Sequence, residues 1–186
     1  MGLRKILFIE GVSDSPNGNL RQGFEKLLSK KLTGKMPKIN MGGSKNRVRD
    51  QFLNNRLDGI PLLLVDLDAN EDQRELDLEK NKLTNYRDSI FFMVQEMESW
   101  FLSQPDMLDE YYGPTKTNKK ISDSIPKRIP ADIPNPKELL KKATKDLNKG
   151  EVYHEVKHAV DLLLRLDASK LENDFPDFKR LIEQLK

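Results

Sequence analysis

The chain has 186 residues, of which 37% are hydrophobic, and its formal net charge is +2. This length suits one domain with a buried core, or one domain with a helical annex. The absence of cysteine excludes disulfides, thiolate zinc sites and a cysteine nucleophile. No apolar run approaches membrane-spanning length, and Glu10 interrupts the first one, so we expect a cytoplasmic protein with no signal peptide and no membrane partner.

The small net charge hides an uneven distribution of charged residues along the chain. Residues 1–60 carry 12 Lys and Arg against 5 Asp and Glu, and residues 61–110 carry 4 against 13. Residues 111–186 are basic again, with 16 against 12. Basic flanks around an acidic middle fit a metal site within a surface that attracts phosphates, although solvated helix faces produce the same pattern.

The N-terminal part alternates between strand patterns and amphipathic helix patterns. Residues 4–9 predict a first strand, and the leucine and phenylalanine spacing over residues 20–32 predicts a helix that ends at Gly34. The further predicted elements are strands over 36–41, 61–65 and 89–94 and helices over 44–57, 70–83 and 96–102, the last ended by Pro105. This alternation favours an α/β fold with a mainly parallel sheet and helices on both faces.

The composition changes after residue 112. Residues 113–136 hold five prolines and a basic cluster, which indicates an ordered excursion or a flexible loop. Helices are expected over residues 136–148, 152–164 and 175–185, the first of them with Pro136 at its start. We therefore divide the chain into an α/β core over residues 1–112 and a basic proline-rich loop with C-terminal helices, packed on the core, over residues 113–186.

Acidic residues follow two of the predicted strands. Glu10 ends the first strand, while Asp66 and Asp68 follow the strand over residues 61–65. Ligands of open parallel sheets bind beyond the carboxyl ends of the strands, and side chains alternate along an extended chain, so all three are expected at one edge. Carboxylates this close repel one another unless they share protons or bind a cation, and oxygen ligands suit Mg²⁺ or Mn²⁺. The alternative is ordinary strand-end and turn carboxylates.

These acidic motifs resemble those of TOPRIM (topoisomerase–primase) domains, which carry a glutamate after the first strand and an Asp-x-Asp after a later strand. Residues 10–14, Glu-Gly-Val-Ser-Asp, are similar to the first motif of the overcoming-lysogenization-defect (OLD) nucleases. Residues 92–102 and the Phe-Pro-x-Phe of residues 175–178 are similar to a small bacterial TOPRIM-like family of unknown function. Genes of that family often lie beside genes for ATPases.

The resemblance implies a TOPRIM/Rossmann-like sheet with a C-terminal helical extension and assigns roles to the matching residues. It makes Glu10, Asp66 and Asp68 catalytic. The Mg²⁺ or Mn²⁺ ligands that it implies are Glu10, Asp14, Asp66, Asp68 and Glu98. Asp14 matches an additional acidic position of the nuclease branch. Glu98 lies near where that branch can supply another acidic ligand, but the motif differs there, and Glu96 is the alternative to Glu98.

Basic side chains would hold the nucleic-acid backbone beside such a site. The candidates are Lys45, Arg47 and Arg49 of the helix over 44–57, and Lys116, Lys119 and Lys120 of the loop. His154 and His158 are four residues apart on a predicted helix, a spacing that can bind zinc, but no clear third ligand accompanies them. Surface histidines are the simpler interpretation of that pair.

The leading hypothesis is a Mg²⁺-dependent nuclease or nuclease-like subunit that hydrolyses phosphodiesters of DNA or RNA, in phage or plasmid defence. The second hypothesis is a non-catalytic partner module of an ATPase. A third is another phosphoryl-transfer enzyme, such as a primase-like polymerase or a nucleotide hydrolase. A P-loop ATPase is excluded because no Gly-x-x-x-x-Gly-Lys-Ser/Thr motif occurs. A homodimer is expected because so small a domain offers limited surface to a substrate.

Overall fold

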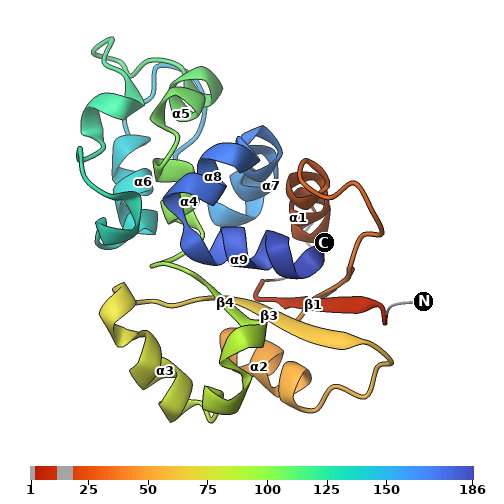
Figure 1. Ribbon diagram of the computed structural model, residues 1–186. Coiled ribbons are helices and arrows are strands. Elements are labelled where there is room, and N and C mark those ends of the chain that lie inside the picture. The colour runs from red at the N-terminus through yellow and green to blue at the C-terminus, as the bar shows by residue number, and fades with distance from the viewer. Residues whose placement is uncertain (1–2, 12–18) are drawn as a thin grey trace.

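The computed structural model describes residues 3–11 and 19–186. Its centre is a four-stranded sheet in which neighbouring strands are parallel and follow the order β2-β1-β3-β4. The strands are β1 (Lys5–Ile9), β2 (Lys38–Met41), β3 (Ile60–Asp66) and β4 (Ile90–Met93). The predicted α/β class with a parallel sheet and helices on both faces is confirmed (Figure 1).

Three α-helices lie between the strands and six follow the last strand within the described residues. The first three are α1 (Leu20–Ser29), α2 (Lys45–Leu53) and α3 (Arg74–Lys80). The later six are α4 (Glu98–Leu102), α5 (Pro105–Tyr112), α6 (Pro136–Ala143), α7 (Glu155–Arg165), α8 (Ala168–Asp174) and α9 (Pro176–Leu185). The sequence patterns missed α5 and α8. Pro105 begins α5 after the end of α4, because proline is tolerated at the first position of a helix.

Alternate residues of β1, β3 and β4 enter two separate apolar cores. On one face, Leu7 and Ile9 of β1 pack in a core with residues of α1, α4, α7 and α9. On the other face, Ile6 and Phe8 pack in a core with residues of α2 and α3. Figure 1 shows this division, with α2 and α3 on one side of the sheet and α1, α4, α7 and α9 on the other. The C-terminal helices therefore share one continuous core with α1 and the sheet.

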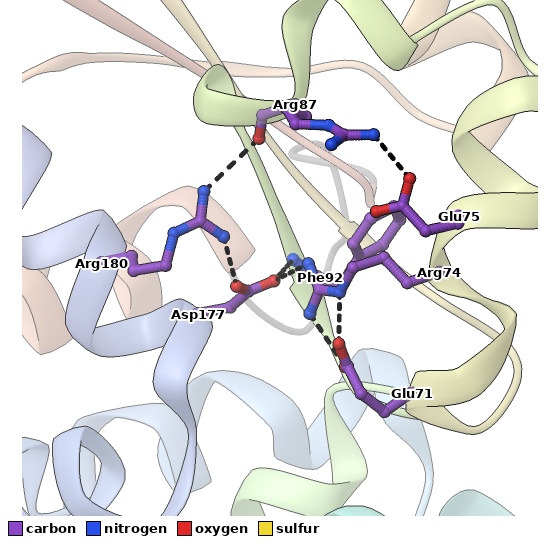
Figure 2. Close-up of polar contacts among 7 residues, drawn as sticks. All are labelled: Glu71, Arg74, Glu75, Arg87, Phe92, Asp177 and Arg180. Carbon is purple, nitrogen blue, oxygen red and sulfur yellow. Dashed lines mark hydrogen bonds and ion pairs between the residues drawn. The ribbon is translucent and has the colours of Figure 1, made fainter.

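The edge strand β4 is tied to α9 by the buried carboxylate of Asp177, which is 5% exposed. Its Oδ2 accepts hydrogen bonds from the backbone N of Phe92 and from Nη1 of Arg74, both at 2.7 Å. Its Oδ1 accepts a hydrogen bond from Nη1 of Arg180 at 2.7 Å. Figure 2 shows this group, which we call the Asp177 network. The network satisfies a backbone donor that the end of a sheet would otherwise leave unpaired.

None of the helices within the described ranges has the length and the apolar content that crossing a membrane requires.

Candidate functional site

Glu10 and Asp66 meet at the carboxyl edge of the sheet. Their strands are neighbours, with Ile9 of β1 opposite Leu64 of β3. Oε2 of Glu10 accepts a hydrogen bond from the backbone N of Asp66 at 3.2 Å, and Oδ1 of Asp66 accepts one from the backbone N of Met97 at 2.9 Å. Oδ2 of Asp66 has no hydrogen-bond partner among the described residues. The structure thus brings together two of the predicted site residues and leaves one oxygen of each, Oε1 of Glu10 and Oδ2 of Asp66, without a hydrogen bond to a described residue.

Negative charge is concentrated around Asp66. Burial raises the pKa of Asp66 well above its ordinary value. The carboxylates that raise it further are those of Glu10, Glu98, Asp68 and Glu96. Burial also raises the pKa of Glu10, against the lowering effect of the hydrogen bond from Asp66. Such crowding is relieved when carboxylates share a proton or when a cation binds between them.

Asp68 lies outside this contact, on the exposed side of the edge. Its side chain is 55% exposed, and Oδ2 accepts a hydrogen bond from Nζ of Lys45 at 2.7 Å. Nζ of Lys45 also lies 3.1 Å from the backbone O of Leu67. The φ angle of Asp68 is +59°, in the left-handed region. Strand geometry therefore ends before Asp68, and the alternation rule that predicted a common direction for Asp66 and Asp68 does not extend to it.

Glu98 is buried beneath the edge, with 2% of its surface exposed. Its Oε1 accepts a hydrogen bond from Oη of Tyr153 at 2.7 Å. Burial raises the pKa of Glu98 to about 7, and the Tyr153 hydrogen bond and the charge of Lys137 only partly oppose this rise. The alternative residue Glu96 accepts a hydrogen bond from the backbone N of Lys137 at 3.2 Å. Neither Glu96 nor Glu98 lines the cavity that opens beside Glu10 and Asp66.

A Glu98→Gln variant is expected to become more stable relative to the wild type as the pH rises. The folded protein holds Glu98 with a pKa of about 7 against an ordinary 4.5, so ionisation of this group opposes folding. The cost is absent at pH values below the ordinary pKa and is complete above about pH 7, where it reaches about 3 kcal/mol. Urea unfolding at about pH 4.5 and about pH 8 measures it. A stability difference that is the same at both pH values would contradict the prediction.

A cavity of about 420 Å³ opens beside Glu10 and Asp66. We call it the acidic cavity. Its apolar lining comes from Leu20, Met93, Met97, Val156 and Val160. Glu155, at the first position of α7, contributes a third carboxylate to the wall. Nothing in the local sequence indicated Glu155, because only the packing of α7 against α1 brings it to this edge.

Two glycine turns hold the rim of the acidic cavity in place. Gly11 and Gly43 exchange backbone hydrogen bonds of 2.8 and 2.9 Å, which join the segments that follow β1 and β2. Both have positive φ angles, +121° for Gly11 and +79° for Gly43. A Cβ on Gly42 would lie 2.3 Å from Cβ of Val48, so the start of α2 packs directly on this backbone. The glycines therefore set the position of α2 relative to Glu10.

The predicted basic residues do not form one surface. Arg49 is 6% exposed, and its Nη2 pairs with Oδ2 of Asp77 at 2.6 Å. A buried ion pair thus replaces the surface contact that was expected of Arg49. Arg47 is exposed on α2, whereas Lys45 pairs with Asp68. The exposed residues Lys116, Lys119 and Lys120 lie in the segment between α5 and α6, across the sheet from α2 (Figure 1).

The described part of the chain contains no preformed metal cluster. Within residues 3–11 and 19–186, no group of three or more His, Asp or Glu side chains has an arrangement that could hold a metal ion. Asp14 was predicted as a ligand and lies outside the described residues. His154 precedes α7, and its backbone N donates a hydrogen bond to Nδ1 of His158 at 2.8 Å. This contact occupies one ring nitrogen of His158 and gives no support to a zinc pair.

A family model matches residues 10–186, and its description is domain of unknown function (DUF4276). No curated protein and no solved structure gave a significant match. The matched region contains Glu10 and Asp66, the loop between α5 and α6 and all of the C-terminal helices. The prediction of membership in a family of unknown function is confirmed, and the match does not extend to TOPRIM domains or OLD nucleases. The chain belongs to the DUF4276 family.

Proposed function

We propose that the acidic cavity binds Mg²⁺ or Mn²⁺ and that the protein hydrolyses phosphodiester bonds of DNA or RNA, as a TOPRIM-like nuclease or nuclease-like subunit. The hydrogen bond from the backbone N of Asp66 to Glu10 carries the proposal, because it places two acidic residues of neighbouring strands together at the ligand-binding edge of a parallel sheet. The crowded negative charge around Asp66 supports it. The role in phage or plasmid defence follows from the resemblance of the motifs alone.

The side chains around the acidic cavity fit a hard divalent cation. The acidic residues that line the cavity offer carboxylate oxygens as metal ligands. Oδ2 of Asp66 has no hydrogen-bond partner in the described part of the chain. Mg²⁺ commonly binds through one or two carboxylates, with waters and substrate phosphates as its other ligands. Two acidic residues that line one cavity, Glu10 and Asp66, are therefore a sufficient protein contribution, and a closed cluster of three is not required.

Each residue near the edge has a definite part in this proposal. A divalent cation, when bound, neutralises charge on the phosphoryl group and lowers the pKa of a water molecule. Glu10 and Asp66 hold the cation. Lys45 places an ammonium group beside Asp68 at the exposed side of the edge, where it can neutralise either that carboxylate or a substrate phosphate. The apolar wall of the cavity limits the access of water to the reacting group.

The direct test is a cleavage assay with purified protein and labelled DNA and RNA, single-stranded and duplex, in Mg²⁺, in Mn²⁺ and in chelator. We expect cutting only when a divalent cation is present. Thermal or urea unfolding with the same cations provides an independent measurement. A cation at 100 times its dissociation constant should stabilise the fold by about 2.7 kcal/mol.

The two measurements separate the hypotheses. Cutting with cation, together with stabilisation by it, supports the hydrolase. Stabilisation without cutting would favour a non-catalytic partner module, for which co-purification with an ATPase is the next experiment. Neither cutting nor stabilisation would remove the metal site and the proposed reaction together.

A further inference from the structure

A second and more open cavity, of about 620 Å³, lies where α2 runs beside the edge strand β2. We call it the β2-edge groove. Three arginines and several side-chain amides line it, together with a single carboxylate, Asp50. The arginines are Arg21, Arg47 and Arg56, and the amides on α2 and just after it are Gln51, Asn54 and Asn55. The groove therefore combines positive charge with groups that both donate and accept hydrogen bonds.

The arginines of the β2-edge groove are available to a ligand. Arg21, Arg47 and Arg56 are exposed, and none forms an ion pair with a described residue. Arg49 differs, because it is buried on the same helix and pairs with Asp77. A guanidinium group presents several donors in a planar fork that matches a phosphate, so three of them around one groove favour a phosphate-rich ligand.

The β2-edge groove adjoins the acidic cavity through the start of α2. Ser44 lines the acidic cavity, and Arg47, three residues later, lines the groove. A Cβ on Gly43 would lie 3.8 Å from Cδ of Arg47, so that arginine stem passes directly over the glycine turn. Gly43 in turn is hydrogen-bonded to Gly11, the residue after Glu10. The start of α2 therefore forms a common boundary of the groove and the acidic cavity, and a phosphate chain in the groove would lie next to the carboxylates.

The form of the acidic cavity indicates what kind of polynucleotide fits. The cavity is concave, and its apolar lining suits a base or a sugar as well as a phosphate. A base in a duplex is stacked and paired, and it enters a pocket only after it is flipped out, at a cost of a few kcal/mol. A single strand has no such cost. Amide side chains in the neighbouring groove can also bond the exposed base edges of a single strand.

We propose that the β2-edge groove binds the backbone of a single-stranded polynucleotide and directs its next nucleotide into the acidic cavity. The groove is the binding surface, and its arginines contact successive phosphates. This inference deepens the proposed hydrolysis, because it names the substrate class of the same site. The binding itself needs no cation and no reaction, so it can be tested separately.

The test measures binding of labelled oligonucleotides in chelator, by fluorescence anisotropy, as a function of salt. The proteins are the wild type, the double variant Arg47→Ala/Arg56→Ala and the control Arg4→Ala. Arg4 is an exposed arginine just before the start of β1, and its side chain does not line the groove. Each lost contact with a single-strand phosphate lowers the slope of log K against log salt by about 0.7. We expect the double variant to lose about 1.4 in slope and about 25-fold in affinity at about 0.1 M salt.

The oligonucleotides compared in this experiment are single-stranded DNA, single-stranded RNA and a duplex of the same sequence. We expect the wild type and Arg4→Ala to bind a single strand more tightly than the duplex, and the better of the two single strands identifies the preferred sugar. Unfolding curves check that the variants are folded, and Arg21→Ala, on α1, provides an independent variant of the groove. Duplex binding as tight as single-strand binding would overturn the inference, as would a double variant that behaves like Arg4→Ala.

The same assay separates this inference from the proposed reaction. Single-strand binding that depends on Arg47 and Arg56 but gives no cutting in Mg²⁺ or Mn²⁺ leaves the groove assignment standing and removes the hydrolase. Cutting by a protein that binds no single strand leaves the hydrolase standing and removes the groove assignment.

Discussion

An Asp66→Asn variant is expected to lose roughly 10²–10³-fold in cation-dependent cutting, while its cation-free form stays at least as stable as the wild type. A cation ligand contributes several kcal/mol to the stabilisation of charge in the transition state, and each 1.36 kcal/mol is a factor of ten in rate. Asparagine keeps the size of the side chain and an oxygen that can accept the hydrogen bond from Met97. The loss should therefore reflect the charge and not the fold.

The stability of the cation-free variant follows from the pKa of Asp66. The folded protein raises this pKa by burial and by the neighbouring carboxylates, so ionisation of Asp66 opposes folding. That cost is absent below the ordinary pKa and grows as the pH rises through the raised value. Asparagine does not ionise and avoids the cost. At about pH 8 the variant should thus gain stability in chelator and lose the stabilisation that Mg²⁺ or Mn²⁺ gives to the wild type.

Two measurements and one matched control decide this prediction. Cutting rates with cation and unfolding free energies with and without cation are compared for the wild type, Asp66→Asn and Asp68→Asn. Asp68 is exposed and paired with Lys45. The Asp68→Asn variant should therefore lose less than Asp66→Asn in cutting rate and in stabilisation by the cation. A purely structural Asp66 would instead give a destabilised Asp66→Asn protein whose response to cations is unchanged. That result would remove Asp66 from the metal site.

An Asp177→Ala variant is expected to lose about 3–5 kcal/mol of unfolding free energy. The change removes a buried acceptor that serves Phe92, Arg74 and Arg180 (Figure 2). The backbone N of Phe92 is buried, and a donor left without a partner there costs about 1–3 kcal/mol. Arg74, whose side chain is 19% exposed, loses one of its two anionic partners and keeps Glu71.

Urea unfolding at neutral pH measures the effect, and two further variants test its cause. Arg180→Ala removes the more exposed partner, whose side chain is 40% exposed, and should cost no more than about 1 kcal/mol. Asp177→Asn keeps an acceptor for Phe92 and should lose less than Asp177→Ala. Equal losses for Asp177→Ala and Arg180→Ala would mean that the backbone contact with β4 contributes little.

The sequence indicated the strands well because their apolar runs are short, rich in branched residues and bounded by turns or carboxylates. The run over residues 61–65 became β3, and Glu10 and Asp66 lie where two strands end. Adjacent parallel strands bring such ends together, so the proximity of Glu10 and Asp66 followed from local patterns and one topological rule. The division between helices and loops was less accurate, since Pro105 both follows one helix and begins the next.

The composition of the chain and its periodic patterns thus determined the α/β class and the parallel sheet. They also determined that Glu10 and Asp66 lie at the ends of neighbouring strands, because strand ends are encoded within a few residues. Only the tertiary structure decided which other side chains reach that edge. Glu155 arrives there through the packing of α7 on α1, Asp68 turns toward Lys45, and Arg49 is buried beside Asp77. The physical reason is that these placements depend on contacts between segments far apart in the chain, and such contacts leave no periodic signal in the sequence around either residue.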